Sequence, residues 1–359
     1  MSLALALGRR GLGNTWPNPA VGAVIVRQQS GTPVVVGRGW TQAGGRPHAE
    51  VEALGRAGDA ARGATMYVTL EPCSHHGKSP PCADAIVAAG IARVVSALED
   101  PNPEVAGQGH ARLRAAGIAV EVGLGAAEAR RDHAGHLRRM GEHRPQVTLK
   151  LAMSADRRVG AAGRRPVEIT GEAARARVHR MRAMNDAILI GIDTAIADDP
   201  QLTCRLPGME KLSPVRVVLD TYLRLPPGGG LAKSARDTPV WVVTGADASA
   251  EAERALRQQG VEVLRAPAQA GRLALPAVLG LLAERGISRL MVEGGPTVAA
   301  SFVAADLVDE AALFHSAKAL GPDGIDALEG VPLEALTSKM TSLGREPVGD
   351  DSVEFFARA

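Results

Sequence analysis

Three residues able to bind zinc and one carboxylate able to move protons occur in the first quarter of the chain. The sequence reads His48-Ala49-Glu50, followed by Pro72-Cys73 and, after eight further residues, by Cys82. A catalytic zinc ion takes three protein ligands and a water, and it lowers the pKa of that water to about 7. Glu50 lies two residues from His48 and can carry protons without binding the metal. The pattern predicts a zinc-dependent deaminase, with His48, Cys73 and Cys82 as ligands and Glu50 as general acid and base.

The gap between the cysteines leaves another interpretation open. The generic deaminase signature has two residues between them, whereas eight intervene here. A closed structural zinc site would need a fourth ligand, which His75 or His76 could supply. Glu50, and the strand-like run at 65–70 that leads to Cys73, argue against a closed site. A non-catalytic zinc protein is a related alternative, and it predicts that changing Glu50 has no effect on activity.

Composition limits the classes of function. The 359 residues favour two domains, and the 45% hydrophobic content is sufficient for two cores. A net charge of +2 and only 3% aromatic residues disfavour nucleic-acid and membrane-surface binding. Three cysteines, two of them predicted metal ligands, favour a reducing compartment. No apolar run approaches the roughly 18 residues of a membrane span. We therefore expect a cytoplasmic protein.

The elements that position these residues alternate between strand and helix. In the first half we expect strands at 21–26, 34–37, 65–70, 93–98 and 120–122, with a turn at 30–33, and helices at 49–57, 82–89, 111–116 and 126–140. Such alternation predicts an α/β sheet covered by helices, and both metal-binding segments would lie at helix starts. The polar segment 141–145 marks a domain boundary, which gives domains at 1–143 and 146–359.

The second half has a similar pattern and a possible phosphate site. We expect strands at 147–153, 187–190, 215–219, 240–243 and 289–292, and helices at 172–183, 248–259 and 276–285. The last of these strands runs into Glu293-Gly294-Gly295-Pro296-Thr297, and a helix resumes at Val298; such a glycine turn can bring backbone N–H groups to a phosphate. Residues 191–194 form a second glycine-containing loop. Glycine turns after strands are often only tight turns, and no G-x-G-x-x-G follows a strand, so the corresponding dinucleotide-binding fold is unsupported.

Motifs in both halves resemble the family of bifunctional riboflavin-biosynthesis deaminase–reductases over nearly the whole chain. They are PNPAVG (17–22), HAEV (48–51), VTLEPCSH (68–75), KSPPC (78–82), DPNP (100–103), VAG (105–107), ADDPQLTCR (197–205) and VEGGPT (292–297). The eight-residue gap between the cysteines is a feature of this family.

The resemblance implies a fold, two reactions and two cofactors. A three-layer domain like cytidine deaminase would precede a domain like dihydrofolate reductase. The first would use Zn²⁺ to deaminate 2,5-diamino-6-(5-phosphoribosylamino)pyrimidin-4-one hydrolytically, and the second would use NADPH to reduce the ribosyl group to a ribityl chain. The partner would be this small-molecule substrate, with no nucleic acid or membrane, and a homo-oligomer is possible.

The resemblance also assigns contacts to individual residues. In the deaminase, the substrate contacts would be Asn18, His75, Lys78, Asp100 and Asn102. In the reductase, the NADPH contacts would be Ala152, Thr194, Asp198, Gly295, Pro296, Thr297, Val298, Ala299, Ala300 and Ser301. The reductase substrate contacts would be Arg182, Leu202, Arg205 and Glu293. Of these, Arg182 and Arg205 could hold the ribose phosphate between them in a forked geometry.

This chain departs from the family at several positions. Thr41 stands near a family histidine, and Ser154-Ala155-Asp156-Arg157 replaces the usual Ser-Leu-Asp-Gly. Pro166 replaces a serine that would touch substrate, and Glu168 replaces a tryptophan that would lie on the cofactor. These changes motivate an alternative, an active deaminase with a weakened reductase domain that acts as a binding or oligomerisation module. A nucleic-acid or free-nucleoside deaminase is disfavoured by the charge, the cysteine spacing and the second domain.

Overall fold

The computed structural model describes residues 1–102, 105–161 and 167–358. Its contacts divide the chain into two compact units, Met1–Arg144 and Pro145–Ala359. In the described part of the chain, no helix combines the length and apolarity needed to cross a membrane. Pro166, one of the departures noted above, lies outside the described residues.

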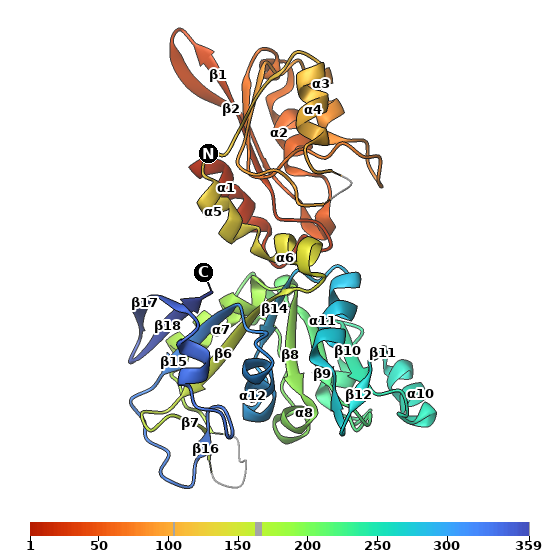
Figure 1. Ribbon diagram of the computed structural model, residues 1–359, viewed down its shortest axis with the longest axis vertical. Coiled ribbons are helices and arrows are strands. Elements are labelled where there is room, and N and C mark those ends of the chain that lie inside the picture. The colour runs from red at the N-terminus through yellow and green to blue at the C-terminus, as the bar shows by residue number, and fades with distance from the viewer. Residues whose placement is uncertain (103–104, 162–166, 359) are drawn as a thin grey trace. The chain divides into compact units, whose positions relative to one another are not determined.

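The amino-terminal unit is built on a five-stranded sheet in the order β2-β1-β3-β4-β5 (Figure 1). The strands are β1 (Gly22–Gln29), β2 (Thr32–Trp40), β3 (Thr65–Val68), β4 (Arg93–Ser96) and β5 (Ala119–Val122). β1 is antiparallel to β2 and β3, whereas β3, β4 and β5 are parallel. The helices are α1 (Ser2–Gly8), α2 (Ala49–Ala57), α3 (Cys82–Ala88), α4 (Gln108–Ala115), α5 (Ala126–Asp132) and α6 (Ala134–Glu142).

Helices cover both faces of this sheet. The main core joins Ala23 and Ile25 of β1 to Ala53 of α2 and Ile86 of α3. On the other face, α1 packs against Val24. The unit therefore has three layers, as the sequence predicted.

Two glycines allow α2 to pack directly on the sheet. A Cβ at Gly37 or at Gly39 of β2 would come within 2.3 Å of a carbonyl oxygen of α2. Only residues without a side chain permit this approach. The contact fixes the start of α2, where His48 and Glu50 lie, against the sheet.

The β1–β2 turn is shorter than predicted. Ser30 and Gly31 alone connect the strands, with φ of 50° and 82°. Positive φ at both positions matches the two-residue turn whose twist suits a hairpin. The strands therefore extend through positions 32 and 33, which the sequence analysis had assigned to the turn.

The predicted single helix at 126–140 is two helices that meet at His133. This residue is buried, and its Nε2 lies 3.0 Å from the hydroxyl of Thr69, just after β3. The hydroxyl also accepts a hydrogen bond from the N–H of Gly22. The break thus places a polar ring at the end of the central strand, a contact that helical periodicity does not reveal.

The second unit contains a nine-stranded sheet in the order β11-β10-β9-β8-β14-β6-β15-β18-β17 (Figure 1). Its strands are β6 (Gln146–Met153), β8 (Ala187–Gly191), β9 (Val215–Leu219), β10 (Val240–Thr244), β11 (Glu262–Arg265), β14 (Arg289–Val292), β15 (Glu310–His315), β17 (Thr341–Val348) and β18 (Asp351–Ala357). The pairs from β11 to β15 are parallel, and β18 and β17 are antiparallel. Two short ribbons pair β12 (Ala268–Gln269) with β13 (Arg272–Leu273) and β7 (Arg158–Gly160) with β16 (Ile325–Asp326).

Seven α-helices are described in this unit: α7 (Glu172–Ala183), α8 (Ile192–Asp198), α9 (Gly230–Lys233), α10 (Ala250–Gln259), α11 (Leu275–Glu284), α12 (Pro296–Ala304) and α13 (Glu334–Thr337). One core joins β8, β9 and β10 to α9 and α10, and another joins α7 to β14, β15 and β18. Because β6, β8 and β14 are parallel, their carboxyl ends meet at one edge of the sheet. Residues of β6 and β8, together with Glu293 immediately after β14, line a cavity there.

Candidate functional site

The three predicted zinc ligands meet at one point of the amino-terminal unit. His48 is the N-cap of α2, Cys73 lies in the segment after β3, and Cys82 is the first residue of α3. Nδ1 of His48 lies 3.3 Å from Sγ of Cys82 and 3.7 Å from Sγ of Cys73. In a tetrahedral site with zinc–nitrogen bonds of about 2.0 Å and zinc–sulfur bonds of about 2.3 Å, such atoms lie about 3.5 Å apart. The donor set therefore fits zinc.

The two thiols differ in their protonation. Hydrogen bonding to Cys82 is the main cause that lowers the pKa of Cys73 to about 4. Hydrogen bonding to Cys73, together with burial, raises the pKa of Cys82. One thiolate is thus formed in the protein alone, and a bound cation would favour the second.

The structure places Asn18 against His48, one of the predicted zinc ligands. Its amide nitrogen lies 3.1 Å from Nε2 of His48 and donates to the carbonyl of Gly45 at 2.8 Å. This contact orients the imidazole from the side opposite the sulfur atoms. Outer contacts of this kind are a common part of zinc sites.

Glu50 is buried in the first turn of α2, with 3% of its surface exposed. Burial raises the pKa of its carboxyl group to about 7, and the nearby His48 opposes that shift. A group that titrates near neutrality can both accept and release a proton at that pH.

The segment between the cysteines is mostly exposed. His75, His76 and Lys78 are all exposed. Two groups of possible metal donors occur among the described residues; one consists of His48, Cys73 and Cys82, and neither group includes His75 or His76. The closed structural site is therefore not supported, and His75 and Lys78 are open to a ligand.

Asp100 is held by its neighbours at the edge of the sheet. It is buried, and its Oδ1 accepts the N–H of Asn102 at 2.9 Å and lies 3.1 Å from Nε2 of His136. Burial would raise the pKa of Asp100, but His136 and the N–H of Asn102 keep it below its ordinary value. His136 had not been predicted, because nothing in the sequence joins α6 to this loop.

Thr41 has a structural contact in this chain. It is buried, and its hydroxyl accepts the N–H of Val21 at 3.0 Å.

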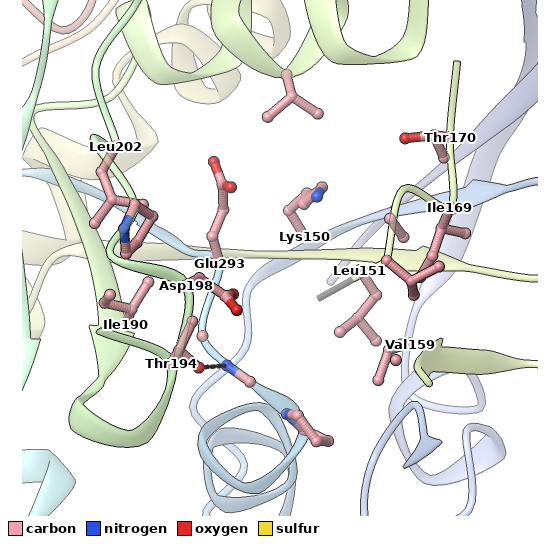
Figure 2. Close-up of a pocket in the computed structure, with 18 of the residues that line it drawn as sticks. Lys150, Leu151, Val159, Ile169, Thr170, Ile190, Thr194, Asp198, Leu202 and Glu293 are labelled. Carbon is pink, nitrogen blue, oxygen red and sulfur yellow. Dashed lines mark hydrogen bonds between the residues drawn. The ribbon is translucent and has the colours of Figure 1, made fainter. Parts of the chain in front are cut away.

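The second unit has a cavity of about 680 Å³ at the carboxyl ends of β6, β8 and β14 (Figure 2). Nine of the predicted reductase residues line it: Ala152, Arg182, Thr194, Asp198, Leu202, Arg205, Glu293, Gly295 and Pro296. Burial raises the pKa of Asp198. Both predicted substrate residues and predicted cofactor residues thus face one space.

Arg182 and Glu293 form a two-pronged ion pair inside this cavity. Nε and Nη2 of Arg182 donate to the carboxylate of Glu293 at 2.8 and 2.9 Å, and Nη1 donates to the carbonyl of Thr203. The predicted fork of Arg182 and Arg205 on a phosphate needs correction, because Glu293 already occupies the fork of Arg182. The guanidinium of Arg205 contacts Gln201 and is exposed.

Helix α12 starts beside Thr194, whose hydroxyl accepts the N–H of Gly295 at 3.1 Å (Figure 2). A second cavity of about 680 Å³ adjoins this start, and it is lined by Thr194, Gly295 and three further predicted cofactor residues, Thr297, Val298 and Ser301. Ala299 and Ala300 are buried in α12 and line neither of the two cavities.

Lys150 is a cavity residue that the sequence analysis missed. It points into the first cavity, as does Glu293 (Figure 2). Burial lowers the pKa of Lys150, and the negative charge of Glu293 opposes this. The only signal in the sequence was a lysine inside an otherwise apolar strand, at 147–153.

Glu168 also lines the first cavity. Its carboxylate lies 3.4 Å from Nη1 of Arg175, which lines the same cavity, and 79% of its side chain is exposed. Arg175 balances the charge that Glu168 would otherwise present to a phosphate-rich cofactor.

The fold and these two sites define a two-domain enzyme that joins a zinc deaminase to a nucleotide-dependent reductase. The cytidine and deoxycytidylate deaminase zinc-binding region matches residues 1–98, and the RibD C-terminal domain matches residues 145–353. The riboflavin biosynthesis protein RibD of Escherichia coli is 41% identical over 92% of this chain and 91% of its own length. That of Aquifex aeolicus is 39% identical over 100% of this chain and 97% of its own length.

Solved structures agree in fold over the whole chain. RibD of Acinetobacter baumannii is 36% identical with a TM-score of 0.87, and the diaminohydroxyphosphoribosylaminopyrimidine deaminase/5-amino-6-(5-phosphoribosylamino)uracil reductase of Thermotoga maritima is 32% identical with a TM-score of 0.85. In each case 100% of this chain and 97% of the other are covered. The chain belongs to the RibD family of bifunctional deaminase–reductases of riboflavin biosynthesis, which use zinc in one domain and NADPH in the other.

Family membership confirms the predicted fold classes, with a cytidine-deaminase-like domain and a reductase domain like dihydrofolate reductase. It favours the intact bifunctional enzyme over an active deaminase with a weakened reductase domain that acts as a binding or oligomerisation module.

Proposed function

We propose that the two domains act in turn on one phosphoribosyl pyrimidine. Residues 1–143 would deaminate the diaminohydroxyphosphoribosylaminopyrimidine, and residues 146–359 would reduce the resulting 5-amino-6-(5-phosphoribosylamino)uracil. The Thermotoga maritima relative is named for both activities. The observation that carries the proposal is the meeting of His48, Cys73 and Cys82 beside a buried Glu50.

In the deaminase, His48, Cys73 and Cys82 hold the metal. Zinc, when bound there, lowers the pKa of a coordinated water so that hydroxide is available at neutral pH. Glu50 accepts a proton as water attacks the amino-bearing ring carbon, and it then delivers protons to the ring nitrogen and the departing ammonia. Its buried carboxyl group, with a pKa near 7, suits both steps.

The remaining deaminase contacts come from three segments. Asn18 orients His48, and exposed His75 and Lys78 are placed to meet the polar tail of the substrate, with Lys78 as a point charge for phosphate. Asp100 and Asn102 lie at the carboxyl edge of β4 and would bind the pyrimidine.

Glu50→Gln tests the role of this carboxyl group. We expect a fall in the deamination kcat of about 10³, since general acid–base catalysis contributes roughly 10²–10⁴, with one zinc retained per chain. Glu52→Gln is a matched control on the same helix, because Glu52 pairs only with Arg56 among the described residues. Full activity in Glu50→Gln would instead support a non-catalytic zinc protein.

In the reductase, the two cavities beside α12 would hold the cofactor, and Leu202, Arg205 and Glu293 would contact the substrate. NADPH, when bound, supplies a hydride. Opening of the ribose ring breaks its bond between C1′ and the ring oxygen, which then needs a proton. Lys150 is an ammonium group inside the cavity with a pKa lowered by burial, so it can donate this proton. The Arg182–Glu293 pair keeps Lys150 beside a negative charge.

Lys150→Met separates this role from cofactor binding. We expect reduction to fall at least 100-fold while NADPH binding, followed by nucleotide fluorescence, changes less than threefold. Lys211→Met, at an exposed position of the same unit, is the control. Equal losses of reduction and NADPH affinity would show that Lys150 serves binding instead.

The cellular setting is also a proposal. The net charge of +2 supports action on a free metabolite in the cytoplasm, without nucleic acid or membrane. A homo-oligomer formed through the second unit is supported by the exposed edge strand β17, where Leu343 is 60% exposed. Sedimentation of the full chain tests the assembly.

A further inference from the structure

Glu71 is a fully buried acidic residue to which the proposed chemistry gives no role. It lies between β3 and Cys73, and none of its side-chain surface is exposed. Its Oε2 accepts the backbone N–H groups of Asp100 at 3.1 Å and Gly107 at 2.9 Å, and its Oε1 accepts that of His110 at 3.1 Å. One carboxylate thus binds three points of a segment about 30–40 residues further along the chain.

Two of these N–H groups belong to the start of α4. Gly107 is the N-cap of this helix, and no side chain of its own segment caps it. The first N–H groups of a helix lack partners within it, and a carboxylate is the charge that the helix start favours. Glu71 therefore supplies the cap from another part of the fold.

The backbones are also in direct contact here. A Cβ at Gly109 would lie 2.0 Å from the carbonyl oxygen of Pro72. The start of α4 therefore rests on the Pro72–Cys73 peptide, which leads directly into the proposed zinc ligand Cys73. The parallel pairing of β3 with β4 brings the ends of both strands to this edge.

The third N–H group belongs to Asp100, one of the proposed substrate contacts. Its carboxylate is held independently by Nε2 of His136 and the N–H of Asn102. Glu71 thus fixes the backbone at Asp100, and His136 fixes its side chain. Glu71 and His136 are both buried, so either side chain can affect substrate binding without touching the substrate.

We propose that Glu71 is a positioning residue of the deaminase, whose buried carboxylate fixes the loop bearing Asp100 and Asn102 relative to Cys73 and so sets affinity for the pyrimidine. This inference rests on the proposed deaminase function. Removal of the carboxylate frees the loop backbone, so the substrate must order it on binding and KM rises. The zinc ligands themselves keep their contacts.

Glu71→Gln and Glu71→Ala in the full zinc-loaded chain form the test. The amide keeps one acceptor oxygen and alanine keeps none. We expect KM for the phosphoribosyl pyrimidine to rise about threefold in Glu71→Gln and at least tenfold in Glu71→Ala. The kcat should stay within threefold of wild type, with one zinc per chain. In Glu71→Ala the amides of Gly107 and His110 should exchange hydrogen at least tenfold faster.

Glu52→Gln is the control, since Glu52 lies on α2 and its carboxylate pairs with Arg56, away from the contacts of Glu71. An unchanged KM in both Glu71 variants, or a loss of activity that follows loss of zinc, would overturn the proposal. If the wild-type chain fails to deaminate the pyrimidine, the proposed function fails instead. Hydrogen exchange at Gly107 and His110 would then still decide whether Glu71 holds the loop.

Discussion

Replacing Arg182 with methionine is expected to destabilise the reductase unit by about 4 kcal/mol at pH 7. The side chains of Arg182 and Glu293 are only 13% and 8% exposed, and two hydrogen bonds join them. Breaking a buried pair by removing one partner typically costs roughly 3–5 kcal/mol, because the other charge stays buried. The lost hydrogen bond to Thr203 adds about 1 kcal/mol. Lys150 is a second cation near Glu293 and compensates part of its charge after Arg182 is removed. The expected loss of stability therefore lies at the lower end of the summed range.

The loss of stability caused by Arg182→Met should depend on pH. Burial would raise the pKa of Glu293, but Arg182 and Lys150 bring it below its ordinary value. Such a group stabilises the fold above its unfolded pKa, about 4.3, and this contribution is lost as pH falls through the folded pKa. In Arg182→Met the carboxylate of Glu293 stays buried but loses the positive charge that kept its pKa low. Its folded-state pKa therefore rises, and protonation of Glu293 removes the cost of a buried unpaired charge. The stability difference should therefore narrow between pH 7 and pH 4.

Trp241 offers a specific probe for this measurement. It is buried in β10 and is the single tryptophan of the second unit, since Trp16 and Trp40 lie in the first. With Trp16→Phe and Trp40→Phe as background, urea unfolding followed by fluorescence reports the reductase unit alone. The double variant Arg182→Met/Glu293→Gln removes both charges and should recover at least half of the loss.

A loss below 1 kcal/mol, or a loss independent of pH, would refute this reasoning. So would a double variant no more stable than Arg182→Met. Either result would mean that Glu293 is solvated or neutral in the folded protein.

Two further changes test the other parts of the molecule. Glu168→Trp should tighten NADPH binding about three- to tenfold, because aromatic contacts add roughly 0.5–1.5 kcal/mol. The exposed ion pair with Arg175 that is lost contributes little to stability. An unchanged Kd in a fluorescence titration would place this side chain away from the cofactor. Stripping zinc with a chelator should abolish deamination and leave reduction of added 5-amino-6-(5-phosphoribosylamino)uracil within twofold, because all three predicted ligands lie in the first unit. Loss of both activities would contradict this division.

The sequence placed the three predicted zinc ligands in recognisable positions, and the structure brings their side chains together. His48 and Cys82 begin helices, and Cys73 follows a strand, so local patterns place all three. Family resemblance added the cavity residues around Glu293. The first and last residues of α2, α7 and β14 are those predicted from the sequence. In these elements the apolar periodicity stops at residues that also favour a helix or strand end.

Partnerships between distant residues could not be predicted in this way. No spacing rule joins Glu71 to the start of α4, Asp100 to His136, or Arg182 to Glu293, because each pair forms only when the sheet is assembled. The strands β15, β17 and β18 were missed as well. β17 is exposed along nearly its whole length, so its residues do not alternate between buried and exposed.

The break between α5 and α6 affects how long a fragment must be to fold as an independent deaminase domain. The zinc-binding region recognised by similarity ends at residue 98, yet the rings of His133 and His136 lie buried beside Thr69 and Asp100. A fragment cut at residue 98 would lack Asp100 and Asn102 as well as both helices, and Thr69 at the end of the central strand would lose its contact with His133. Excising a working deaminase, or grafting it onto another enzyme, therefore requires the two helices through Glu142, although they contribute no ligand to the metal.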